Sequence, residues 1–83
     1  MDYRYVLDAE VAEVILTLSS RQRWEFVKIF RSLASNPNQR GELSFRDSKG
    51  RKIQKRRFGL WLISYWPDHA VKEVRIVGVQ PAK

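Results

Sequence analysis

The sequence predicts an α+β fold in which a two-helix hairpin packs on one face of a mainly antiparallel, curved β-sheet, in the order β-αα-ββββ. Three observations predict it. Apolar residues recur with the 3.6-residue period of helices between residues 8 and 35. After Gly41 they recur with the two-residue period of strands. The length of 83 residues suits one small domain, so we expect residues 1–83 to form a single domain.

The chain begins with a short strand and a first helix. Residues 3–7 alternate as in a strand, and Asp8 is a favourable N-cap residue for the helix that follows. Over residues 9–18 the apolar side chains recur at i, i+3, i+4 and i+7 and form one stripe. We therefore expect an amphipathic helix with one buried face.

A second helix is expected over about residues 20–35. Ser19 and Gln22 have the spacing of a capping box, which marks a helix start. Pro37 ends the helix, because proline forces the preceding residue, Asn36, out of helical geometry. Trp24 lies off the apolar stripe, so it either packs on a flanking strand or is exposed as an anchor for a partner.

Four strands follow. They are separated by turn residues at positions 47–50, at Gly59 and at positions 67–70, where glycine, proline and aspartate concentrate. The expected strands cover residues 43–46, 52–58, 60–66 and 71–79.

Strict alternation assigns the side chains of these strands to two faces of the sheet. The face expected beneath the helices carries Leu43, Phe45, Ile53, Trp61, Ile63, Tyr65, Val74 and Ile76. The opposite face is expected to carry Ser44, Arg46, Lys52, Gln54, Arg56, Leu62, Ser64, Trp66, Glu73, Arg75 and Val77.

Positive charge is concentrated in the second half of the chain. The formal net charge is +7, and residues 42–83 hold ten basic and four acidic side chains. Residues 49–57 hold six basic side chains and no acid. A face that combines cations with Trp66 suits RNA, because cations hold phosphates and a ring stacks a base. The alternative is a solvated polar face on which Trp66 only covers a sheet edge.

Several functional classes are excluded or disfavoured. The chain has no cysteine, so it has no disulfide and no cysteine-based zinc site, and we expect neither a metal nor a cofactor. His69 is the sole histidine and lies in a Pro-Asp-His-Ala turn, which favours a turn role over acid–base chemistry. No apolar run is long enough to span a membrane, and no signal peptide opens the chain, so we expect a cytoplasmic protein.

The order of these motifs resembles the RelE/ParE toxin superfamily of type II toxin–antitoxin modules. The similarity covers almost the whole chain. It rests on the opening strand, the two helices and the sequence Leu33-Ala34-Ser35-Asn36-Pro37 at the end of the second helix. It continues through Gly41, the basic strand Lys52-Ile53-Gln54-Lys55-Arg56 and Gly59-Leu60-Trp61-Leu62-Ile63-Ser64-Tyr65, which is similar to the family's Gly-x-Tyr-Arg-hydrophobic-x-Tyr strand.

The resemblance implies a toxin that a partly disordered antitoxin neutralises. RelE-like members bind the ribosome and cut mRNA without a metal, through attack of the ribose 2′-hydroxyl on the adjacent phosphate. Basic side chains on the open sheet face then orient the phosphate and stabilise charge. On this basis we expect Lys52, Arg56 and Arg75 to be catalytic, and Arg46, Lys55, Arg57 and Trp66 to bind RNA.

Two departures from the family pattern keep other functions open. The arginine of the Gly-x-Tyr-Arg strand is Leu62 here, and the chain ends without the Tyr or His that many nucleases of the family carry. Gln54 also replaces the second member of a two-residue-spaced basic pair that begins at Lys52, and Arg56 is a possible substitute. The alternatives are a ParE-like toxin that inhibits DNA gyrase, and a non-catalytic member that binds RNA.

Overall fold

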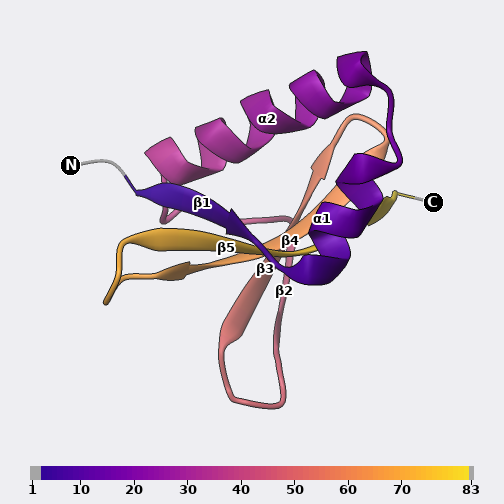
Figure 1. Cartoon of the computed structure of the whole chain (residues 1–83). Helices are drawn as coiled ribbons and strands as arrows, with labels where there is room; N and C mark the ends of the chain where they lie inside the picture. The colour runs from indigo at the N-terminus through magenta and orange to yellow at the C-terminus, as the bar shows by residue number, and fades with distance from the viewer. Residues whose placement is uncertain (1–2, 83) are drawn as a thin grey trace.

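The computed structural model describes residues 3–82 and has the predicted α+β architecture (Figure 1). The two helices lie on one side of a five-stranded sheet, and the hairpin of the second and third strands projects away from them (Figure 1). The elements are β1 (Arg4–Leu7), α1 (Ala9–Leu16), α2 (Ser20–Ser35), β2 (Leu43–Arg46), β3 (Lys52–Phe58), β4 (Trp61–Asp68) and β5 (Glu73–Pro81).

The strand order in the sheet is β1-β5-β4-β3-β2. β1 pairs with β5 in parallel, and the other three pairings are antiparallel, which confirms a mainly antiparallel sheet. The first and last strands of the chain are therefore neighbours, and α1 and α2 form the crossover between β1 and the rest of the sheet. A register shift between Ser64 and Tyr65 leaves Val77 as an extra residue in β5, so this bulge interrupts the expected alternation.

The hydrophobic core lies between the helices and one face of the sheet. Val11 of α1 and Phe26, Phe30 and Leu33 of α2 form one buried cluster with Ile63, Tyr65, Val74 and Ile76 of the central strands. The aromatic rings of Phe26 and Phe30 are 5.7 Å apart, and Trp61 packs edge-on against Phe26 at 5.1 Å. The apolar stripes predicted for both helices are thus used to cover β4 and β5.

The second helix has the predicted bounds and cap. The Ser19 hydroxyl accepts from the Gln22 backbone N–H, and the Gln22 side chain accepts from the Ser19 backbone N–H, both at 3.2 Å. Trp24 is 55% exposed, and the Arg31 guanidinium lies 5.5 Å from its ring centre. None of the helices in the described part of the chain is long and apolar enough to cross a membrane.

Other boundaries differ from the prediction. Helix α1 ends at Leu16 rather than at residue 18. At this end the Thr17 hydroxyl donates to the Val14 carbonyl at 2.7 Å. Strand β4 continues through Pro67 to Asp68, and β5 begins only at Glu73. Asp8 has the extended backbone of an N-cap residue but makes no side-chain capping bond, because its carboxylate lies toward Arg75 instead.

Candidate nucleic-acid interface

The orientation of β3 differs from the sequence prediction. Phe58 is paired with Trp61 across the two-residue loop Gly59-Leu60, and Arg56 is paired with Ile63. Side chains of directly opposed residues point to the same face of a sheet. Arg56 therefore shares the face of the core residue Ile63, and the expectation that Lys52, Arg56 and Arg75 project from one uncovered face is wrong.

The face turned away from the helices, here called the open face, carries the other half of β3. Ile53, Lys55 and Arg57 alternate onto it, with Lys55 opposite Ser64 and Arg57 opposite Leu62 of β4, and Arg51, directly before β3, lies over Trp66. Ile53 is buried but lies outside the core cluster beneath the helices, which fits its place on the opposite face. From the neighbouring strands the open face receives Leu43 and Phe45 of β2, Leu62, Ser64 and Trp66 of β4, and Arg75 of β5.

Two of these cations lie over aromatic rings. The Arg51 guanidinium is 4.7 Å from the centre of the Trp66 ring, and the Lys55 ammonium is 5.4 Å from the centre of the Phe45 ring. Both distances are within the range of cation–π attraction. The open face thus presents two aromatic platforms on either side of Ile53, each with a cation beside it.

Arg51 is also fixed by the hairpin that precedes β3. Its Nε donates to Asp47 Oδ2 at 2.8 Å, and its backbone N–H donates to Asp47 Oδ1 at 2.9 Å. Burial raises the pKa of the Asp47 carboxyl, but the hydrogen bonds from Arg51 and Lys49 outweigh it and the pKa is lowered overall. The ionised Asp47 therefore orients Arg51 toward Trp66.

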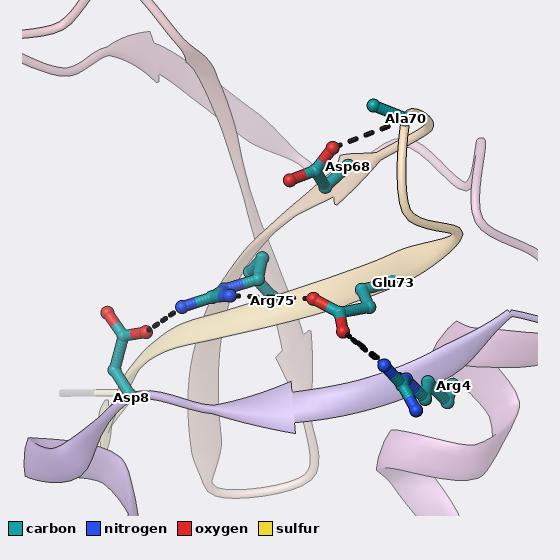
Figure 2. A network of polar contacts seen from close by, with 6 residues as sticks. All are labelled: Arg4, Asp8, Asp68, Ala70, Glu73 and Arg75. Atoms are coloured by element: carbon teal, nitrogen blue, oxygen red, sulfur yellow. Dashed lines mark hydrogen bonds and ion pairs between the residues drawn. The ribbon is translucent and has the colours of Figure 1, made fainter.

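Arg75 belongs to a network at the β1 edge of the open face (Figure 2). Its guanidinium lies 3.5 Å from Glu73 and 3.6 Å from Asp8, and Glu73 also accepts from Arg4 at 2.9 Å. The Glu73 side chain is only 12% exposed, so this carboxylate is the most enclosed member of the network. Arg75 is therefore partly neutralised, in contrast to Lys55 and Arg57, which form no ion pair within residues 3–82.

The remaining predicted residues lie on the helix side of β2 and β3. Arg46 is paired with Lys52 and donates to the Gly50 carbonyl at 2.8 Å, so it closes the hairpin. Arg56 lies 5.1 Å from the Phe58 ring. Of the seven predicted site residues, the structure thus brings Lys55, Arg57, Trp66 and Arg75 to the open face and leaves Arg46, Lys52 and Arg56 on the other.

The sequence prediction did not place Arg51, Leu43, Phe45 and Ile53 on the open face; Leu43 and Ile53 were assigned to the helix side. Phe45 was expected in the core, and Arg51 was only part of a charge run. The length of the Gly59-Leu60 loop is the feature of the sequence that could have predicted which β3 side chains face the helices. A two-residue hairpin loop places its flanking residues on one face, so a core-facing Trp61 requires Phe58, Arg56 and Gln54 on the core side.

The loop between α2 and β2 covers the helix side of β3 and β4. The buried Tyr65 hydroxyl donates to the Gln39 carbonyl at 3.0 Å, and the Gly41 N–H donates to Gln54 Oε1 at 3.0 Å. Burial raises the pKa of Tyr65, although the charge of Arg56 opposes the shift. This loop closes the helix side, and the open face of β3 and β4 stays accessible.

The arrangement suits contact with a single-stranded polyanion. Lys55 and Arg57 offer unpaired positive charge, and the rings of Trp66 and Phe45 offer surfaces on which bases stack. No strand residue on the open face is a histidine or a tyrosine. Chemistry at this face would consequently depend on orientation and charge stabilisation rather than on a side chain that titrates near neutral pH.

Comparison with known proteins identifies the fold. No family model matches the sequence, and no curated protein matches it. Among solved structures, a chain of the archaeal RelE–RelB complex from Pyrococcus horikoshii is similar with a TM-score of 0.74 and 18% identity, over 98% of this chain and 96% of that one. A chain of the toxin–antitoxin complex RelBE2 from Mycobacterium tuberculosis is similar with a TM-score of 0.77 and 18% identity, over 98% and 99%. The chain shares the fold of these two matched chains.

Proposed function

We propose that this chain is the toxin of a type II toxin–antitoxin module and cuts mRNA in translating ribosomes without a metal or a cofactor. The observation that carries the proposal is the joint placement of Lys55, Arg57 and the Arg51–Trp66 pair on one uncovered sheet face. The fold shared with chains of two toxin–antitoxin complexes supports it.

The proposed reaction is an internal transesterification of RNA. The ribose 2′-oxygen forms a bond to the adjacent phosphorus while the bond from phosphorus to the 5′-oxygen breaks. The 2′-hydroxyl loses its proton and the departing 5′-oxygen gains one, which leaves a 2′,3′-cyclic phosphate and a 5′-hydroxyl. Negative charge grows on the phosphate oxygens, and Lys55 and Arg57 are placed to stabilise it.

Trp66 and Phe45 have a positioning role in this proposal. A base stacked on either platform holds its sugar and phosphate against the cations of β3. Correct placement of the 2′-oxygen opposite the leaving group lowers the barrier without any titrating side chain. In this proposal the ribosome holds the mRNA backbone in the conformation that places the 2′-oxygen opposite the leaving group.

We further propose that a cognate antitoxin neutralises the chain. The formal net charge of +7 favours an acidic partner, and a partly disordered segment that folds on binding can cover a large part of so small a molecule. The two similar structures are chains of a RelE–RelB complex and of a toxin–antitoxin complex, which supports a protein partner of that class.

Leu62 favours a second candidate, a gyrase-inhibiting toxin without nuclease activity. Leu62 lies directly opposite Arg57 on the open face, at the position where the family pattern has an arginine. A leucine there removes one cation from the phosphate site. The same departure is compatible with a member of the fold that binds RNA without cutting it.

Two assays on the same purified chain separate these functions. We expect added toxin to produce new mRNA 5′ ends in translating ribosomes, and the Lys55→Gln and Arg57→Gln variants to lower the cleavage rate about 10²-fold or more. Arg23→Gln, an equal charge change on α2, should cleave like the wild type. If the mRNA stays intact and gyrase supercoiling is inhibited, the chain is a gyrase-inhibiting toxin and not a nuclease. If the mRNA stays intact and the chain binds RNA in a salt-sensitive way, it is an RNA-binding protein without nuclease activity.

A further inference from the structure

A small polar pocket lies on the helix side of the sheet, separate from the open face. Its volume is about 280 Å³, and it lies between the loop that follows α2 and the adjoining ends of β3 and β4. It is lined by Pro37, Asn38, Gln39, Arg40, Lys52, Gln54 and Pro67. The lining contains two cations and three amides and no carboxylate.

The loop that forms this pocket is held in place by several hydrogen bonds. The Gln39 N–H donates to the Asn36 carbonyl at 3.0 Å, and the Gln39 carbonyl accepts from the Tyr65 hydroxyl at 3.0 Å. The Gly41 N–H donates to Gln54 Oε1 at 3.0 Å. The pocket is therefore preformed, and a ligand would not have to order its walls.

Most of the charged and amide side chains of the pocket are not used by the fold; the exception is Gln54, whose Oε1 accepts from the Gly41 N–H. Neither Arg40 nor Lys52 forms an ion pair or a side-chain hydrogen bond with any residue between 3 and 82, and both residues are exposed. The Gln39 side-chain oxygen is buried and has no hydrogen-bond donor among the described residues. Two unpaired cations beside the side-chain amides of Asn38 and Gln39 fit a ligand with a phosphate and a polar ring.

We propose that this pocket binds one nucleotide of the RNA strand, with its phosphate on Lys52 and Arg40 and its base between Pro37 and Pro67, within reach of the amides. The inference rests on the proposed function, because it assigns a second contact to the same RNA. Lys52 and Pro67 directly follow Arg51 and Trp66 in the sequence, so the pocket and the Trp66 platform lie back to back at one end of β3 and β4.

The test is a nuclear magnetic resonance titration of the whole chain with adenosine monophosphate, inorganic phosphate and adenosine. Adenosine monophosphate should shift the amide signals of residues 37–41 and 52–54 and bind more tightly than adenosine. Lys52→Gln and Arg40→Gln should each weaken binding about fivefold, the upper range for one exposed charge contact. Lys49→Gln, an exposed lysine in the neighbouring hairpin, should bind like the wild type.

The outcomes also separate this inference from the proposed function. The proposed nucleotide site would be overturned if adenosine monophosphate shifted only amide signals of the open face. It would also be overturned if Lys52→Gln and Arg40→Gln, with spectra that show a native fold, both bound the nucleotide as tightly as the wild type. Active mRNA cleavage with no response of the pocket to the nucleotide would overturn the pocket alone. Conversely, pocket binding that persists in the Lys55→Gln, Arg57→Gln double variant supports a separate site even if cleavage is absent.

Discussion

Gly41 lies against the backbone of Lys55 so closely that a Cβ atom at position 41 would overlap with the Lys55 carbonyl oxygen. The φ angle of Gly41 is not in the left-handed region, so space alone requires glycine here. This contact brings the loop after α2 onto the helix side of β3. Because Lys55 itself points to the open face, one strand supports both the loop and the proposed RNA contact.

Gly41→Ala is therefore expected to destabilise the chain by about 1–3 kcal/mol, the usual cost of overpacking. Urea unfolding measures the free energy, and hydrogen exchange of the residue-41 amide reports whether the loop has left β3. Gly50→Ala is the matched comparison, because a Cβ there meets nothing within 4 Å and only its φ of +80° is unfavourable. An unchanged exchange rate at position 41 would contradict the contact.

The Tyr65 hydroxyl gives a second, milder prediction about the same loop. Tyr65→Phe removes the bond to the Gln39 carbonyl and should lower the free energy of unfolding by about 0.5–1.5 kcal/mol. The ring itself is buried and stays in place, so the core should be retained. Tyr5→Phe is a suitable control, since no side-chain hydrogen bond of Tyr5 occurs within residues 3–82. Equal stability of the two variants would argue against the Tyr65 bond.

Local signals in the sequence were sufficient to predict most elements. The bounds of α2 follow from the Ser19–Gln22 capping box and from Pro37, which act within a few residues of each helix end. The bounds of β3 were also predicted correctly. Each of these features depends on interactions between near neighbours in the chain.

The face of each β3 side chain depends on pairing with β4, which simple alternation does not determine. Because Ile53 is apolar, alternation assigned it and every second residue of β3 to the helix side. In the structure Ile53 is buried on the open face. A strand with apolar residues on both faces gives alternation no unique answer. The pairing of Arg75 with Asp8 and Glu73 likewise joins residues far apart in the sequence, and no local motif indicates it.

The two faces of β3 can be compared by exchanging cations on one strand. Lys55→Gln and Arg56→Gln remove equal charge from adjacent residues that point to opposite faces. If RNA binds the open face, Lys55→Gln should weaken its binding severalfold and lower the salt dependence, and Arg56→Gln should have a smaller effect. Fluorescence anisotropy with a labelled single-stranded RNA at several salt concentrations measures both quantities. A larger loss of RNA affinity with Arg56→Gln would mean that RNA binds the helix-side face of β3, which carries the residues predicted from alternation.

Glu42 links the stability of this region to pH. The Arg57 backbone N–H donates to Glu42 Oε1 at 2.8 Å and holds the pKa of that carboxyl below the ordinary value for glutamate. The ionised group therefore stabilises the fold above the unfolded-state pKa, and this contribution is lost as the pH falls through the lower folded-state pKa. Glu42→Gln should flatten that part of the stability profile in thermal melts between about pH 2 and 6. Glu13→Gln, a change at an exposed residue of α1, is the control, and matching profiles for Glu42→Gln and wild type would contradict the link.

Glu73 offers a prediction in which stability and binding change in opposite directions. Its nearly enclosed carboxylate accepts from Arg4 and lies beside Arg75, so Glu73→Gln should destabilise the fold by roughly 1–3 kcal/mol through weaker charged hydrogen bonds. The same change removes a negative charge from the open face and leaves Arg75 less neutralised. RNA affinity at low salt should consequently rise about two- to fivefold in folded Glu73→Gln protein, because one solvent-screened charge interaction between Arg75 and bound RNA contributes up to about 1 kcal/mol. Glu25→Gln, which frees Lys28 on α2, controls for the gain in net charge. An equal rise in both variants would mean that RNA responds to total charge, and that Arg75 has no particular part in binding.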